Sequence, residues 1–295
     1  MIQVENLVKH FAKVRAVDGL SFTVGRGEIL GLLGPNGAGK TTTIRTLMDI
    51  FKADSGTVRL SGKPITEASK ACIGYLPEER GLYKNFRVLE CLTYLGALKG
   101  LPRKEARRRA EALLAEVDLA AFARRRVKEL SKGMNHKAQF LASIIHDPDV
   151  LIIYEPFQGL DPVNTDVLKS ILLREQDRGK TIILSTHNMN QVEEMCDRIL
   201  LMHRGQTVLY GALTDIQAQY TEHAVLLRCD SIPKNLTGVQ RVEKHNRSYE
   251  LVLEHDASPQ EVLRQLVDAD VTIHRFEVAT PPLEAIFISA VGEVP

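Results

Sequence analysis

Short, uninterrupted apolar runs alternate with longer amphipathic stretches over the first two thirds of the chain. The runs Ile29 to Leu33, Val150 to Tyr154 and Thr181 to Thr186 have the composition of strands that are buried on both faces. Between Val88 and about Ala142 the apolar residues recur at helical spacing instead. Strands that alternate with helices favour a largely parallel sheet whose functional site lies at the carboxyl ends of the strands.

The two ends of the chain have a different pattern. Residues 1 to 25 predict short strands around a loop at His10 to Lys13. After about Tyr220 the expected elements are strands at Ala224 to Cys229, Tyr249 to Leu253 and Thr272 to Glu277, and helices at Pro259 to Leu266 and Leu283 to Ser289. We therefore expect a main domain over residues 1–217, with a helical subdomain at about 80–147, and a small α+β accessory domain over residues 218–295.

Composition narrows the possible function classes. Lys and Arg number 38 against 37 Asp and Glu, and Trp is absent, so neither net charge nor aromatic content favours a nucleic-acid partner. The four cysteines are far apart and lack C-x-x-C spacing, which favours a reducing compartment. No apolar stretch reaches the ~18 residues that span a bilayer, so any membrane crossing would belong to another chain.

The strongest chemical signal is a G-x-x-x-x-G-K-[ST] motif between the Ile29 to Leu33 run and a helix-compatible stretch, Thr41 to Met48. Glycines leave room for backbone N–H groups to surround a polyphosphate, and the following helix offers its positive N-terminal end. Lys40 would reach the outer phosphates, and Thr41 would give its hydroxyl to Mg²⁺. The predicted nucleotide-binding residues are Gly34, Pro35, Asn36, Gly37, Ala38, Gly39, Lys40, Thr41 and Thr42. The alternative is a glycine-rich turn before a helix.

Each of the other candidate site residues is weak evidence of function when it is taken alone. Phe11 is either a platform for an adenine ring or an ordinary half-buried loop aromatic. Ser131 is well placed to cap a helix. Glu155 closes a buried apolar strand, where a carboxylate needs water or a partner, and His187 ends the next strand. The arginine runs 107–109 and 124–126 have acidic neighbours and no aromatics, which is typical of solvated helix faces.

Taken together and in order, these features resemble the ATP-binding cassette (ABC) family of ATPase subunits over about residues 1–215. The features are Phe11, the Gly34 to Thr41 loop, the loop at Glu78, Leu130 to Met134, Glu155, Gly159 to Pro162 and His187. The resemblance implies an α/β fold of the P-loop NTPase cassette type, with a mostly parallel sheet, N-terminal antiparallel strands, a helical subdomain and a small C-terminal α+β domain. Pro77 to Tyr83, Ser131 to Met134 and the C-terminal part look further like the sodium-efflux and drug-efflux exporter branch.

The resemblance also implies roles for the site residues. Two cassettes would meet head to tail, with Ser131 and Gly133 of one against the terminal phosphate of the ATP held by the other. Glu155 would polarise the attacking water as general base, and His187 would contact the terminal phosphate. Asp161 would couple the two sites of the dimer. Whether the second cassette is identical or different stays open at this point.

Three features, at four positions, depart from the family pattern. Tyr154 stands where an aspartate usually holds the Mg²⁺ shell, and a neutral phenol does this poorly. Glu78 replaces the expected glutamine and is therefore a candidate metal ligand beside Thr41. Lys132 and Met134 replace the commoner glycine and glutamine of the signature loop. We hypothesise that ATP still binds and that hydrolysis is slower than in a Tyr154→Asp variant.

The resemblance leads us to expect the ATPase subunit of an ABC exporter, peripheral to the cytoplasmic face of the cell membrane, with ATP and Mg²⁺ as cofactors. Its partners would be a separate membrane-spanning permease subunit and a second cassette. The permease would contact the segment Glu79 to Leu98. One alternative is a nucleotide-binding regulatory subunit with little turnover, which Tyr154 keeps open. Another is a soluble cassette ATPase without a transport function, although no long heptad pattern or internal repeat supports it.

Overall fold

Two compact units, Met1–Leu213 and Thr214–Glu293, make up the chain in the computed structural model. The structure describes residues 1–12, 14–78, 81–220, 224–233, 236–245, 248–254, 256–278 and 282–292. Lys13 and Glu79, which belong to segments singled out in the sequence, lie outside the described residues. Each unit is described by itself below.

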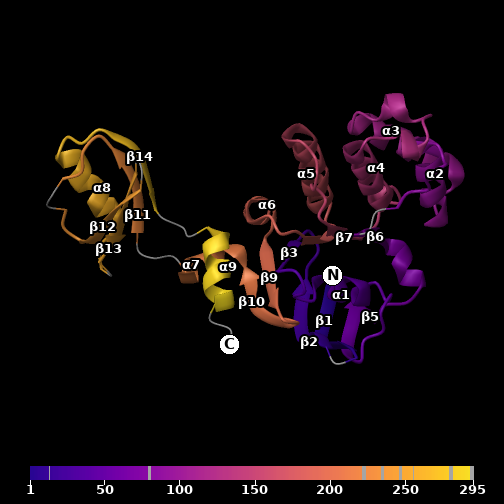
Figure 1. The fold of residues 1–295 in the computed structure, drawn as a ribbon, viewed down its shortest axis with the longest axis horizontal. Helices are drawn as coiled ribbons and strands as arrows, with labels where there is room; N and C mark the ends of the chain where they lie inside the picture. Colours follow the sequence, from indigo (N-terminus) through magenta and orange to yellow (C-terminus); the bar gives the residue numbers. More distant parts are fainter. Residues whose placement is uncertain are drawn as a thin grey trace. The chain divides into compact units, whose positions relative to one another are not determined.

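The first unit contains the N-terminal hairpin, the parallel sheet and the helical subdomain. Its elements are β1 (Ile2–Phe11), β2 (Val14–Val24), β3 (Ile29–Leu33), α1 (Lys40–Leu47), β4 (Ser55–Leu60), β5 (Lys63–Pro64), β6 (Ile73–Leu76), α2 (Val88–Leu98), α3 (Arg103–Glu116), α4 (Lys132–Ile144), β7 (Val150–Tyr154), α5 (Pro162–Asp177), β8 (Thr181–Ser185), α6 (Met189–Met195), β9 (Arg198–His203) and β10 (Gln206–Ala212). Figure 1 labels most of them along the ribbon.

The central sheet has the strand order β10-β9-β3-β8-β7-β6. Adjacent strands of this sheet pair in parallel, except for β9 and β10, which are antiparallel. This confirms the expected mostly parallel sheet. Strands β3, β7 and β8 are almost entirely buried, as their uninterrupted apolar runs predict. Because these strands are parallel, the residues that follow each of them lie at one edge of the sheet.

The N-terminal strands β1 and β2 form an antiparallel hairpin that is longer than the short strands expected from the sequence. Phe11 is the last residue of β1 and pairs with Val14, so His10 and Phe11 belong to a strand and not to the expected loop. Register shifts along β1 explain why a simple alternation did not predict one long strand. The sheet order β2-β1-β4-β5 makes this a second, antiparallel sheet.

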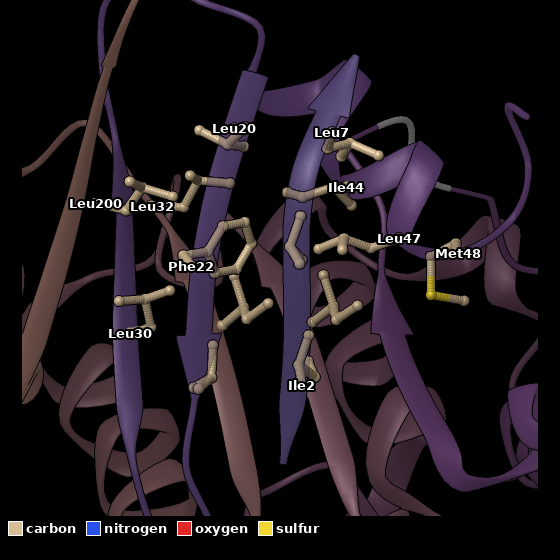
Figure 2. Packing of buried hydrophobic residues seen from close by; sticks show 14 of the residues in the cluster. Ile2, Leu7, Leu20, Phe22, Leu30, Leu32, Ile44, Leu47, Met48 and Leu200 are labelled. Carbon is tan, nitrogen blue, oxygen red and sulfur yellow. The ribbon is translucent and has the colours of Figure 1, made fainter. Parts of the chain in front are cut away.

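The main core lies between this hairpin, the parallel sheet and helix α1. Ile2, Leu7, Leu20 and Phe22 of the hairpin cluster with buried residues of β3, β9 and α1, as Figure 2 shows. Leu20 is completely buried, and full burial of such a side chain contributes about 1.5–3 kcal/mol. This core fixes the start of α1, and therefore the glycine loop that precedes it.

The helical subdomain consists of α2, α3 and α4, which lie together in Figure 1. The long helical region expected from Val88 to about Ala142 is interrupted twice. Helix α2 ends at Leu98, and Pro102 precedes α3 because proline lacks the N–H that a helix interior requires. After α3, Asp118 has a φ of 57°, which turns the chain out of the helix. Helix α4 then begins behind Ser131.

The second unit contains a sheet of order β12-β13-β11-β14 with antiparallel neighbours. Its elements are α7 (Leu213–Tyr220), β11 (Ala224–Cys229), β12 (Val239–His245), β13 (Ser248–Leu253), α8 (Pro259–Asp268), β14 (Ile273–Val278) and α9 (Leu283–Gly292). Val225 and Leu251 of the sheet cluster with Val262 and Leu266 of α8. The expected strands and helices are present, and α7 and β12 are additions, which completes the expected small α+β fold.

None of the helices in the described part of the chain is long and apolar enough to cross a membrane.

Candidate functional site

The glycine loop joins the end of β3 to the start of α1, where the sequence predicts it. Gly39 directly precedes α1 with a φ of 105°, and a Cβ atom there would lie 2.2 Å from the Ala16 carbonyl oxygen. Gly34 has the same restriction, since its Cβ would lie 2.3 Å from the Met202 carbonyl oxygen. Only glycine fits at these two positions, so the sequence motif follows from how closely neighbouring backbone approaches the loop.

A cleft of about 500 Å³ opens over this loop. It is lined by Val14, Arg15, Ala16, Asn36, Gly37, Ala38, Gly39, Lys40, Thr41, Thr42, Glu78, Tyr154 and Arg204. The predicted phosphate-binding residues from Asn36 to Thr42 are all in this lining, and Gly34 and Pro35 precede them in the same loop. The amino-terminal end of α1 faces the cleft, which gives it the positive end of a helix dipole.

Lys40 is held inside the loop by its own backbone. Its Nζ atom donates to the carbonyl oxygens of Gly34 at 2.6 Å and Pro35 at 3.1 Å. Burial lowers the pKa of Lys40, and the carboxylates of Glu155 and Glu78 oppose that shift. A buried cation of this kind gains from an anionic ligand, because the ligand replaces the water that burial has removed.

Three polar side chains from separate elements meet at one end of the cleft. The Thr41 hydroxyl donates to Glu78 Oε2 at 3.0 Å. Tyr154 lines the cleft beside these two residues, and burial, followed by the Glu78 carboxylate, raises the pKa of Tyr154. The phenol is therefore protonated at neutral pH.

Glu155 and His187 meet at the carboxyl ends of β7 and β8. Glu155 Oε1 accepts hydrogen bonds from the His187 backbone N–H at 3.0 Å and from its Nδ1 at 2.6 Å. Glu155 Oε2 accepts from the Thr186 hydroxyl at 3.3 Å. The Glu155 carboxylate is nearly buried, whereas the His187 ring is 71% exposed. The backbone of Glu155 has a φ of 44°, a left-handed conformation that non-glycine residues adopt at a cost and often at functional sites.

The signature segment lies at the start of α4 and is turned to solvent. Ser131 caps the helix by accepting a hydrogen bond from the Met134 N–H at 3.2 Å, as its position predicts. Ser131 and Lys132 are exposed, and Gly133 is half-buried, where a Cβ atom would lie 3.6 Å from the Leu160 side chain. Ser131 and Gly133 are not part of the cleft lining of their own chain.

Phe11 and Asp161, which were also predicted as site residues, contact residues outside the cleft lining. Phe11 is 41% exposed and packs edge-on against Phe51, with 5.2 Å between ring centroids, and it is not in the cleft lining. Asp161 caps α5, where its Oδ1 accepts from the Asn164 N–H at 2.9 Å and this bond lowers its pKa. Asn164 in turn accepts from Lys137 of α4 at 2.6 Å, which ties the signature helix to α5.

Several residues at the site were not predicted from the sequence. Arg15, near the start of β2, and Arg204, in the turn between β9 and β10, line the cleft, and no motif marks either of them. Thr186 holds the Glu155 carboxylate and also bonds Gln191 Oε1 at 3.1 Å. The signal for Thr186 was its place between a buried strand and His187, because such strand ends meet in a parallel sheet.

The oxygen atoms at the end of the cleft fit a magnesium ion. Mg²⁺ prefers hard oxygen ligands and is usually held by one or two protein groups together with substrate phosphates and water. Thr41 offers a hydroxyl and Glu78 a carboxylate, and both line the cleft beside the phosphate loop. In the described residues no group of three or more His, Cys, Asp or Glu forms an all-protein metal site.

Comparison with family models gives two matches. The model described as ABC transporter matches residues 17–158. The model described as ATP-binding protein DrrA1-3-like, C-terminal domain, matches residues 211–291. The first match lies within the first unit, and the second match covers most of the second unit.

Several curated proteins resemble the chain along most of its length. An ABC transporter ATP-binding protein of Bacillus subtilis, YhaQ, is 34% identical over 297 residues, which cover 100% of this chain and 99% of that protein. The linearmycin resistance ATP-binding protein LnrL of the same organism is 32% identical and covers 99% of this chain and 98% of its own. The Nod factor export ATP-binding protein I of Paraburkholderia xenovorans is 40% identical over 214 residues, 72% of this chain and 70% of that protein.

A solved structure of the ATP binding subunit of an ABC transporter superposes with a TM-score of 0.70 at 30% identity, covering 75% of this chain and 93% of the other. A dimeric bacterial ABC transporter cassette has the same fold, with a TM-score of 0.66 at 21% identity, covering 72% of this chain and 99% of the other.

Proposed function

The chain belongs to the ABC transporter ATP-binding proteins, and we propose that it is the ATPase subunit that powers export through a separate membrane-spanning subunit. The observation that carries this proposal is the cleft over the Gly34 to Thr41 loop, beside the Glu155 and His187 pair at the same sheet edge. Exporter-type relatives, named for linearmycin resistance and Nod factor export, support the direction of transport.

We propose that the cleft binds ATP through its phosphates. Backbone N–H groups from Gly37 to Thr42 and the start of α1 surround the inner phosphates, and Lys40 leaves the Gly34 carbonyl to contact the outer ones. Phe11 stacks on the adenine ring, which requires the Phe11 side chain to turn from Phe51 toward the base. Thr41 and Glu78 would hold Mg²⁺, which when bound would supply positive charge to the phosphates.

Glu155 is the proposed general base. An ionised carboxylate has about four acceptor sites, and His187 and Thr186 occupy three of those on Glu155. One site on Oε2 is left to accept a hydrogen bond from the attacking water, which aligns the water and takes up its proton as the bond to phosphorus forms. The Nδ1–H of His187 donates to the carboxylate, so its other ring nitrogen is directed away from Glu155 and is available to the terminal phosphate.

A second cassette completes the site. Members of this family act as dimers, and we propose a second copy of this chain as the partner. Ser131 is exposed and Gly133 half-buried at the amino-terminal end of α4, and neither lines the cleft of its own chain. The free end of this helix attracts an anion, and Lys132 adds a positive charge beside it. The terminal phosphate held by the partner copy is the anion that fits, and Asp161, linked to α4 through Asn164 and Lys137, couples the two sites.

We propose that the membrane-spanning subunit contacts the helical subdomain at the start of α2, which would hold this chain at the cytoplasmic face of the cell membrane. Tyr83, Phe86 and Tyr94 form an exposed aromatic cluster there, with ring centroids 5.2 to 6.0 Å apart. A groove of about 280 Å³ lies nearby and includes Leu82 and Leu98 in its lining. Exposed clusters of large aromatic side chains are typical of protein interfaces.

For the second unit we propose an accessory role in dimerisation or regulation, with a functional boundary near residues 217 and 218. Nothing in the comparisons favours a regulatory subunit without turnover or a cassette ATPase outside transport.

The test of the proposed function is ATP binding and hydrolysis by the purified protein and by Lys40→Ala. A charge-assisted bond contributes about 1.5–3 kcal/mol, so we expect Lys40→Ala to bind ATP roughly tenfold to a hundredfold more weakly. Lys52→Ala is the matched control, because Lys52 is 81% exposed and pairs only with Asp49 in the described structure. Equal ATP affinity in wild type and Lys40→Ala would contradict the proposal.

A further inference from the structure

We propose that Arg15 binds the phosphate nearest the ribose of the bound nucleotide, and that His10 is a positioning residue that holds the Arg15 guanidinium for this contact. The inference rests on the proposed function, because it adds a side chain to the proposed ATP site. Its basis is a chain of hydrogen bonds that runs from Asp54 through His10 to Arg15 and ends at the cleft.

The charges that line the cleft suit a polyphosphate. Of the described residues in the lining, Arg15, Lys40 and Arg204 are cationic, and only Glu78 is anionic. Three positive charges against one negative charge attract a ligand that carries several negative charges. Lys40 belongs to the phosphate loop itself, whereas Arg15 comes from the N-terminal hairpin and therefore meets a different part of the ligand.

The hairpin places Arg15 between the proposed adenine platform and the phosphate loop. Arg15 directly follows Val14, which is the strand partner of Phe11. The next residue, Ala16, approaches the loop closely, since its carbonyl oxygen would lie 2.2 Å from a Cβ atom at Gly39. In a nucleotide the ribose and the first phosphate lie between the base and the outer phosphates. Arg15 occupies the corresponding place along the cleft.

The hydrogen bonds define the protonation state of His10. Arg15 Nε can only donate, so His10 Nε2, which is 3.0 Å away, is the acceptor. The ring hydrogen of the neutral imidazole is therefore on Nδ1, which donates to Asp54 Oδ2 at 3.2 Å. Hydrogen bonds from Lys9 and from the His10 backbone N–H lower the pKa of Asp54 to about 2, so this acceptor stays ionised.

The Arg15 guanidinium is held on two sides and keeps donors for a ligand. Its Nε donates to His10, and one terminal nitrogen donates to Asp18 Oδ1 at 2.9 Å. Asp18 in turn accepts from Gln206 of β10 at 3.1 Å. In the described structure these bonds use two of the five N–H donors of Arg15. The other donors can bind a phosphate oxygen, and little conformational entropy is lost because the side chain is already oriented.

The experiment measures the ATP and ADP affinities of the purified protein by isothermal titration calorimetry with Mg²⁺ present. The variants are Arg15→Gln, His10→Phe and His10→Gln, with Lys40→Ala for comparison. Arg107→Gln is the matched control, because the Arg107 side chain is 65% exposed against 63% for Arg15 and also pairs with a carboxylate, that of Glu111. Thermal unfolding confirms that each variant is folded.

We expect Arg15→Gln to weaken ATP and ADP binding by the same factor, about tenfold, because both nucleotides carry the phosphate nearest the ribose. Lys40→Ala should weaken ATP binding more than ADP binding, since Lys40 contacts the outer phosphates. His10→Phe should weaken the binding of both nucleotides about threefold, because Arg15 keeps its charge but loses one of its two anchors. His10→Gln should recover most of this loss, since the amide oxygen can accept from Arg15 Nε.

Unchanged affinities in Arg15→Gln, or a loss confined to ATP, would overturn the assignment of Arg15 to the phosphate nearest the ribose. A His10→Phe variant that binds as tightly as His10→Gln would overturn the positioning role of His10. A wild type that binds neither nucleotide would overturn the proposed function and the inference together, so the failure of the inference alone is recognisable.

Discussion

Glu155→Gln tests the catalytic assignment with the least disturbance to the structure. The glutamine Oε1 can keep the hydrogen bond from the His187 N–H, and its Nε2 can donate to the Thr186 hydroxyl, which still has Gln191 as an acceptor. The backbone at residue 155 keeps its left-handed conformation in both proteins. We therefore expect a change in unfolding free energy within about 1 kcal/mol, the size of one hydrogen bond.

Turnover should respond very differently. A positioned general base contributes typically about 10²- to 10⁴-fold to a rate, and each factor of ten corresponds to about 1.36 kcal/mol of barrier. The expected loss in kcat is therefore about 10²- to 10⁴-fold, or roughly 3–5 kcal/mol, with ATP affinity unchanged.

The assay combines steady-state phosphate release with equilibrium binding of ATP, and Glu111→Gln on the exposed face of α3 serves as the control for lost charge. A loss of turnover smaller than tenfold, with ATP binding intact, would remove Glu155 from the role of general base. A parallel loss of ATP affinity would show that the substitution acts on binding and would also contradict the assignment.

Three further predictions address the metal, the fold and the loop. Tyr154→Asp should bind Mg²⁺·ATP more tightly and turn over faster than wild type, because an anionic ligand replaces a phenol; a wild type that is already as fast and as tight contradicts this. Burial, with Lys99 nearby, lowers the pKa of His146 from 6.5 to about 4. Between pH 6.5 and 4, His146 is protonated in the unfolded chain but not in the folded one. The free energy of unfolding therefore falls as the pH drops from 6.5 toward 4, by about 3 kcal/mol in total. Denaturant titrations against pH should show a smaller loss in His146→Gln, and identical slopes would refute the assignment. Gly39→Ala should lower the unfolding free energy by about 1–3 kcal/mol more than Gly37→Ala, because only the Cβ at residue 39 meets backbone; equal losses in thermal unfolding would contradict the steric argument.

The sheet edge that carries the site could be predicted from the sequence because its strands are fully buried. A strand buried on both faces is a continuous apolar run, and the polar residue that ends the run marks the edge. This reasoning located Glu155 and His187, and the structure brings the two side chains within 2.6 Å. The glycine motif located the loop in the same way, because Gly34 and Gly39 are required by the approach of neighbouring backbone.

Contacts between distant segments could not be predicted in this way. The edge-on packing of Phe11 against Phe51 depends on how the hairpin meets the end of α1, and no sequence pattern around either residue predicts this contact. Strands β9 and β12 also escaped prediction, because short apolar or mixed runs do not distinguish strand from helix. The hydrogen bond from Thr41 to Glu78, with Tyr154 beside them in the cleft, depends on the register of β6 on β7, which cannot be derived from the sequence.

Sedimentation velocity of Glu155→Gln, with ATP and with ADP, tests most directly whether two copies enclose the nucleotide. We predict a dimer with Mg²⁺ and ATP, a monomer with ADP, and a monomer under both conditions when Ser131→Arg is added, because the arginine obstructs the surface that meets the partner's phosphate. A Glu155→Gln protein that is saturated with ATP and still sediments as a monomer would contradict the account.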